Sequence, residues 1–169
     1  MNINHFLKVF QNSTNLLNSS ELTKLEIDFS VGIYLDSVFL KLYKKEWGNN
    51  FSDPLNANTR IFFSVWVSNK TLLNDKLFYN IHAFKLRDLK GYSISSRDFA
   101  SNFRSKFNAF KHEWENVSVN FGPLTLMEGW VNYNKLEIER TISNLANNFI
   151  KISDLIDETL KIFEHQSNK

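Results

Sequence analysis

The strongest chemical signal in this sequence is a group of basic side chains in the middle of the chain. Residues 85–112 contain seven Lys and Arg residues against two Asp residues, a local net charge of +5. Cations gathered in this way neutralise phosphates, and a tyrosine among them can stack on a base. The sequence predicts a nucleic-acid or anion-binding surface formed by Lys85, Arg87, Lys90, Tyr92, Arg97, Arg104 and Lys111. The alternative is a solvated surface whose cations pair with acidic residues of the last predicted helix.

Acidic side chains offer a second arrangement at the start of the first predicted strand. Glu26, Asp28 and Asp36 share the parity of one strand face, and Lys41 or Lys44 could supply a cation beside them. Carboxylates that hold Mg²⁺ beside a lysine are typical of metal nucleases. A cryptic nuclease site is therefore an extension of the nucleic-acid hypothesis, and a solvated strand face is the alternative.

Other catalytic patterns are absent from the sequence. The chain has no Cys, and its four His residues show no metal-ligand spacing such as His-Glu-x-x-His. Its five Gly residues stand far apart, which excludes a Gly-rich phosphate loop, and no Gly-x-Ser-x-Gly elbow occurs. The sequence therefore predicts no catalytic residue, no metal site and no cofactor. For His82, within a predicted strand, we expect a hydrogen-bonded structural role.

Alternation of apolar and polar residues predicts the strands that would position these side chains. The predicted strands cover residues 25–35, 38–43, 61–68, 76–89 and two short segments within 117–133. We interpret Asp36-Ser37 as a turn rather than a bulge. The strand over 61–68 is apolar on both faces near its middle, which favours a central position. Strands this close in sequence usually pair antiparallel.

Five aromatic residues at steps of three and four predict a helix over residues 95–114. They are Phe99, Phe103, Phe107, Phe110 and Trp114. Ser95 and Asp98 have the spacing of a capping pair at its start. Since the aromatic side chains share one face, we expect that face to be buried against the sheet. A shorter helix is expected over residues 3–18.

A long helix is predicted from about Asn134 to Phe163, with an apolar seam at steps of three and four. The seam includes Ile142, Phe149 and Ile156, which form a candidate homodimer interface with a second copy of the chain. A second apolar row, including Leu136 and Ile150, leaves apolar surface on another side. Such a helix is either enclosed within the fold or placed at an interface.

Together these segments predict one α+β domain over residues 1–169. Its mainly antiparallel sheet of about five strands would be packed by the aromatic helix and the long C-terminal helix. The length suits a single core of this kind.

Three functional hypotheses follow. The first is a non-enzymatic protein-interaction protein with an unidentified protein partner, similar in general character to accessory or immunity-type proteins of bacteria. The second is a nucleic-acid-binding protein that uses the basic segment, and the third is a small-molecule binder with an aromatic-lined pocket. The sequence shows neither a signal peptide nor an apolar run long enough for a membrane span, so a cytoplasmic location is expected.

Overall fold

The computed structural model describes residues 1–165 as an α+β domain built on one antiparallel sheet, which confirms the predicted fold class. Five strands follow one another in the sheet in the order of the sequence. The strands are β1 (Asp28–Tyr34), β2 (Ser37–Tyr43), β3 (Arg60–Ser68), β4 (Lys76–Phe84) and β5 (Thr125–Asn132). Every neighbouring pair is antiparallel, and β3 is the central strand as predicted.

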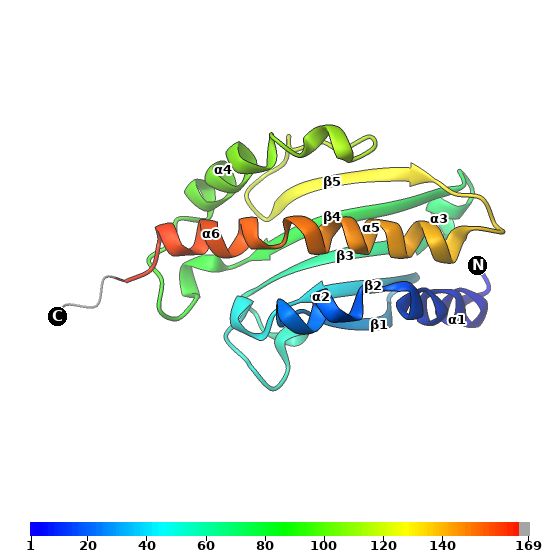
Figure 1. Cartoon of the computed structure of the whole chain (residues 1–169), viewed down its shortest axis with the longest axis horizontal. Coiled ribbons are helices and arrows are strands. Elements are labelled where there is room, and N and C mark those ends of the chain that lie inside the picture. The colour runs from blue at the N-terminus through cyan, green and yellow to red at the C-terminus, as the bar shows by residue number, and fades with distance from the viewer. Residues whose placement is uncertain (166–169) are drawn as a thin grey trace.

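A layer of helices covers one face of this sheet (Figure 1). The helices are α1 (Ile3–Ser13), α2 (Ser19–Lys24), α4 (Ser96–Phe107), α5 (Ile138–Ile152) and α6 (Asp154–Ile162). A single helical turn, α3 (Asn69–Leu72), only connects β3 to β4. The opposite face of the sheet carries no α-helix among residues 1–165 (Figure 1).

Period-two alternation decides which side chains enter the core. Val38, Leu40 and Leu42 of β2 have no exposed surface, and they pair in register with Val67, Val65 and Phe63 of β3, which are also fully buried. Successive strand residues point to opposite faces, so these side chains meet the helices while their neighbours point the other way.

The aromatic helix α4 buries its aromatic face as predicted. Phe103 and Phe107 have no exposed surface, and the Ser95 hydroxyl accepts a hydrogen bond from the backbone N–H of Asp98 at 3.3 Å. The helix ends at Phe107, earlier than expected. A separate 3₁₀ turn over Lys111–Glu113 still brings Trp114 into the core at 5% exposure.

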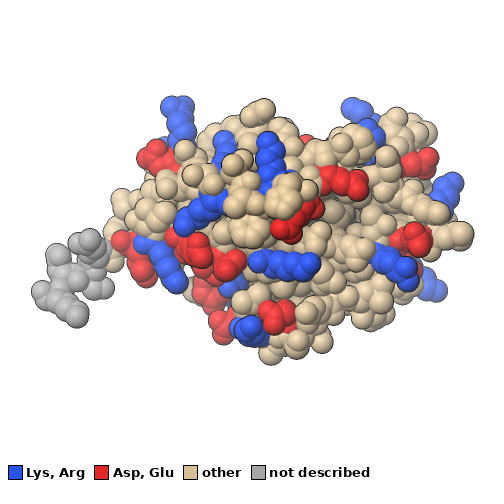
Figure 2. Space-filling model, turned by 45° about the horizontal axis from the view of Figure 1, so that its top comes forward, with Lys and Arg blue, Asp and Glu red and all other residues tan. Residues whose placement is uncertain are grey.

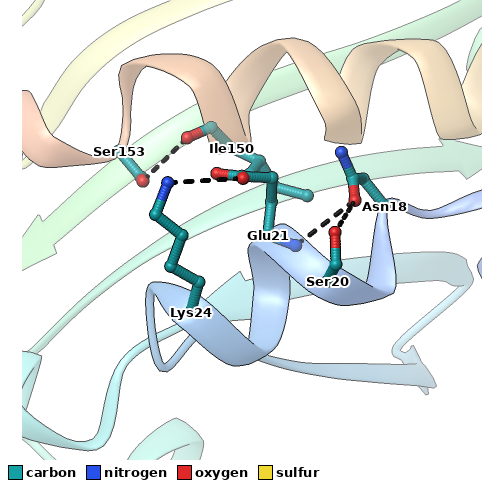
Figure 3. A network of polar contacts seen from close by, with 6 residues as sticks. All are labelled: Asn18, Ser20, Glu21, Lys24, Ile150 and Ser153. Atoms are coloured by element: carbon teal, nitrogen blue, oxygen red, sulfur yellow. Dashed lines mark hydrogen bonds and ion pairs between the residues drawn. The ribbon is translucent and has the colours of Figure 1, made fainter.

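The long C-terminal helix is bent, and it divides into α5 and α6 at Ser153. The Ser153 hydroxyl donates to the backbone carbonyl of Ile150 at 2.9 Å (Figure 3). Serine hydroxyls that bond to the preceding turn often bend helices. Figure 3 also shows the start of the neighbouring helix α2, where the Asn18 side chain accepts from the backbone N–H of Glu21 at 3.2 Å.

Two local predictions need correction. The β1–β2 turn consists of Leu35 and Asp36, one residue earlier than predicted, and Leu35 adopts a left-handed φ of 53°. Residues 117–133 contain one named strand, β5, rather than two, because the first segment contributes only an isolated bridge between Ser118 and Glu128.

Candidate functional site

The side chains of the sheet that point away from the helices form a surface that we call the open face. Its middle consists of three cross-strand rows running from β2 or β3 to β5. One row is polar, and an aromatic row lies on each side of it.

The first row is aromatic. Phe39, Trp66, Phe78 and Trp130 stand opposite one another across four adjacent strands. The rings of Trp66 and Phe78 are 5.1 Å apart, and the ammonium of Lys76 lies 3.4 Å from the ring centre of Trp130. All four aromatic side chains are only partly buried. The row therefore presents apolar surface that residues 1–165 leave accessible.

The second row is polar. Lys41, Ser64, Asn80 and Glu128 stand opposite one another on β2, β3, β4 and β5. The Ser64 hydroxyl donates to Asn80 Oδ1 at 2.6 Å, and Asn80 Nδ2 donates to Glu128 Oε2 at 3.3 Å. Ser64 and Asn80 are buried, so these hydrogen bonds satisfy groups that have lost contact with water.

The third row contains Phe62 and His82, with Phe84 beside them on β4. The ring of His82 stacks on Phe84 at 5.1 Å and lies 5.5 Å from Phe62. His82 Nδ1 is 3.2 Å from the carbonyl oxygen of Leu124, which confirms the predicted hydrogen bonding of this histidine. Burial lowers the pKa of His82 and so favours the neutral imidazole.

A cavity of about 510 Å³ lies over these rows, and we call it the sheet cavity. Its floor is the open face, and its sides are formed by the β1–β2 turn and by the 3₁₀ turn Pro54–Asn56. Its lining consists of Tyr34, Leu35, Ser37, Phe39, Lys41, Leu55, Asn56, Arg60, Phe62, Ser64, Trp66, Asn80, His82, Phe84 and Glu128. A neighbouring hollow of about 350 Å³ shares five lining residues with it, namely Tyr34, Phe39, Lys41, Leu55 and Asn56.

Two cations line the sheet cavity close to one ring. Lys41 Nζ lies 4.6 Å from the ring centre of Phe62, and Arg60 Cζ lies 5.6 Å from it. Burial, followed by the nearby charge of Arg60, lowers the pKa of Lys41 to about 8. Burial also lowers the pKa of Arg60, although a guanidinium still carries its charge at neutral pH. The cavity therefore concentrates positive charge against an aromatic wall.

The predicted basic surface is distributed differently from this cavity. Lys85, Arg87, Lys90, Arg97 and Lys111 are exposed, and Tyr92 is partly buried. Arg104 points inward, where its guanidinium donates to the carbonyl oxygens of Phe121, Gly122, Thr125 and Leu126 at 2.9 to 3.1 Å. Arg104 therefore holds the start of β5 and the segment before it, through two of its three guanidinium nitrogens. On the side of the molecule shown in Figure 2, basic and acidic side chains are interspersed.

The three residues of the predicted dimer interface are buried in the core of the domain. Ile142, Phe149 and Ile156 have no exposed surface, and the Phe149 ring stacks on Phe63 of β3 at 4.6 Å. The C-terminal helix therefore uses this seam to cover its own sheet. A homodimer would require other residues of the chain.

The acidic residues named for a nuclease site are separated. Glu26 precedes β1 with a left-handed φ of 55°, and Asp36 lies in the β1–β2 turn. Asp28 is 3.9 Å from Lys45, whereas Lys44 pairs with Asp157 of α6 at 2.6 Å. Within residues 1–165, no three His, Asp or Glu residues are grouped so that they could hold a metal ion.

Sequence reasoning missed the sheet cavity, although two signals pointed to it. The residues of β3 are apolar on both faces, and polar residues interrupt the same side of adjacent strands at Lys41, Ser64 and Asn80. The first signal correctly indicated a central strand, but no helix of residues 1–165 covers one of its faces. Arg60 is the first residue of β3, and its contact with Phe84 emerges only from the cross-strand register.

Comparison with known proteins gave no match to a family model, a curated protein or a solved structure. No helix in the described part of the chain has the length and apolar character needed to cross a membrane.

Proposed function

We propose that this protein is a binding protein whose ligand, a small organic molecule, occupies the sheet cavity. The observation that carries the proposal is a cavity of about 510 Å³ on the face of the sheet that the helices of residues 1–165 leave uncovered. Small-molecule sites commonly measure about 300–1,000 Å³ and combine apolar walls with a few convergent polar groups.

The lining has the chemistry that such a site needs. Phe39 and Trp66 supply partly exposed apolar surface, while the partly buried Lys41 and Arg60 supply polar groups beside it. A ligand that covers water-accessible aromatic rings is stabilised in the complex by about 25 cal/mol for each Å² of apolar surface buried. Lys41 also has a lowered pKa, a feature that clusters at functional sites.

A protein partner on the same open face is the second candidate, and it retains the interaction-protein hypothesis. The aromatic row that favours it continues beyond the sheet cavity through Phe78 to Trp130. Aromatic side chains and Arg are enriched at the centres of protein interfaces. A partner would therefore use both tryptophans of the row, whereas a ligand confined to the cavity would contact Trp66 alone.

Binding of the neutral fluorescent probe N-phenyl-1-naphthylamine tests the proposed function. The probe should gain fluorescence with the wild-type protein, and Trp66→Ala should weaken its affinity roughly tenfold because truncation of an aromatic contact commonly costs more than 1 kcal/mol. Trp130→Ala is the matched control, since Trp130 belongs to the same row but lies outside the cavity lining.

Two results would contradict this proposal. One is the absence of probe binding to the folded wild-type protein. The other is an equal loss of affinity in the two tryptophan variants, which would indicate a binding surface that extends along the whole row. Circular dichroism of each variant establishes that the protein remains folded.

A further inference from the structure

We propose that the ligand of the sheet cavity is a small organic anion whose charged group lies between Lys41 and Arg60. This inference rests on the proposed function and specifies its ligand class. The ligand would carry one carboxylate, sulfonate or phosphate group on a flat apolar body, with that body against the aromatic walls of the cavity.

Arg60 has unused hydrogen-bonding capacity at this position. Its Nη1 donates to the carbonyl oxygen of Ala57, while its buried Nε has no hydrogen-bond partner within residues 1–165. The guanidinium packs against Phe62 and Phe84, with its Cζ 5.6 and 5.0 Å from the two ring centres. Stacked in this way, a guanidinium keeps a fixed orientation, and its planar fork suits the oxygens of a carboxylate or phosphate.

Lys41 is the second unpaired cation. Its ammonium forms no hydrogen bond or ion pair with another side chain of the described residues, and it lies over the rings of Phe39 and Phe62 at 4.3 and 4.6 Å. Lys41 and Arg60 are both partly buried, and a cation partly removed from water is stabilised by an anionic partner, because an unpaired charge away from water costs free energy. A bound anion would supply that partner to both cations.

The carboxylate that lines the cavity is too far along the polar row to neutralise Lys41. Glu128 stands three strands away from Lys41 in the row, a separation of about 14 Å at the usual spacing of strands. Its Oε2 already accepts from Asn80. Positive charge therefore stays concentrated at the Lys41 end of the cavity, where an anion is complementary to it.

A matched pair of probes tests the charge preference. The fluorescent probe 1-anilinonaphthalene-8-sulfonate carries a sulfonate on the same ring system as N-phenyl-1-naphthylamine. The wild-type protein should bind the sulfonate more tightly than the neutral probe. Lys41→Gln and Arg60→Gln should each weaken sulfonate binding roughly tenfold or more, because hydrogen bonds to charged groups are the stronger class, and should weaken it by a larger factor than they weaken binding of the neutral probe.

Lys76→Gln is the control variant. Lys76 is a cation on the same open face, and it also lies over an aromatic ring, that of Trp130, but it does not line the cavity. Its replacement changes the net charge by the same amount, but because Lys76 lies outside the cavity lining, the affinity for the sulfonate should stay unchanged. Competition by 1-naphthoate and by 1-naphthyl phosphate then distinguishes a carboxylate from a phosphate as the preferred charged group.

The wild-type protein gives a second measurement that does not depend on a variant folding. Sulfonate binding should weaken as the pH rises through about 8, where Lys41 loses its proton, while binding of the neutral probe should stay constant. The other ionisable groups of the cavity are Tyr34, Arg60, His82 and Glu128, and Asp53 and Tyr43 line the neighbouring hollow. The Lys41→Gln variant should lose this alkaline transition, which assigns it to Lys41.

Different results would overturn the inference and the proposed function. Equal affinity for the two probes, with no effect of Lys41→Gln or Arg60→Gln, would overturn the anion inference and leave the binding function standing. An equal loss in Lys76→Gln would also overturn it, since the preference would then reflect net charge alone. Failure of both probes to bind the folded protein would overturn the proposed function itself.

Discussion

Lys41 carries its charge in surroundings that favour the neutral amine. Burial and the charge of Arg60 lower its pKa from 10.5 to about 8 in the folded protein. A group with a lower pKa in the folded state releases its proton on folding, so stability increases with pH between the two values. The cost of the charged lysine is therefore fully present below about pH 8 and disappears as the pH approaches 10.5.

Replacement of Lys41 by Met should remove the free-energy cost of the charged lysine from the folded state. At pH 7 the variant should have a higher free energy of unfolding than the wild type, because Met fills a similar volume without the charge. Above about pH 8 the difference between the two proteins should decrease, since the wild type regains the lost stability. Urea denaturation of both proteins at several pH values measures the difference. A difference that does not change with pH would contradict the shift in the pKa of Lys41.

At the scale of elements, the pairing of β4 with β5 depends on a close fit between Tyr79 and Gly129. These residues stand opposite each other on the face that meets the helices, where Tyr79 is fully buried. The Tyr79 hydroxyl donates to the carbonyl oxygen of Glu115 at 2.5 Å, which fixes the ring over Gly129. A Cβ atom at position 129 would come within 2.5 Å of Tyr79 Cζ, so only glycine leaves room for the ring.

Gly129→Ala should therefore destabilise the protein by about 1–3 kcal/mol, the usual cost of an overpacked core. Gly122→Ala is the matched control, because an added Cβ at position 122 meets nothing within 4 Å. Chemical denaturation should show a lower midpoint for the first variant and little change for the second. Equal midpoints in the two variants would show that the Tyr79 ring can move aside.

At the scale of the whole molecule, charge is nearly balanced. The chain carries 20 basic and 18 acidic residues, and two of the cations of residues 85–112 have partners within the fold. Arg104 is engaged with backbone carbonyls, and Lys106 pairs with Glu158 of α6 at 3.2 Å. The second of these contacts is of the kind that the alternative interpretation of the basic segment expected, a cation paired with an acid of the last helix.

The salt dependence of DNA binding tests the nucleic-acid hypothesis. Each neutralised phosphate contributes about −0.9 to the slope of log affinity against log salt, so four contacts would give a slope near −4. Because Arg104 and Lys106 already have partners within the fold, we expect a slope no steeper than about −2, or no measurable binding at low salt. A slope near −4 that Arg97→Gln reduces by about one unit would instead support the nucleic-acid hypothesis.

Local patterns determined most of the architecture of this chain. Alternation in β1 to β4, the aromatic spacing in α4 and the apolar seam of the C-terminal helix follow from periodicity, because a side chain's face is set by its position within its own element. The same patterns predicted the burial of Phe103 and the central position of β3. Boundaries that depend on a single residue, such as the bend at Ser153 and the turn at Leu35, were missed.

The tertiary structure decided where the candidate site lies. Periodicity shows that β3 is apolar on both faces, but only the packing of the helices shows which face stays open (Figure 1). The register of four strands then places Lys41, Ser64, Asn80 and Glu128 in one row, although the first and last of them are 87 positions apart in sequence. Such a row depends on pairings between distant segments, and a local pattern carries no information about those pairings.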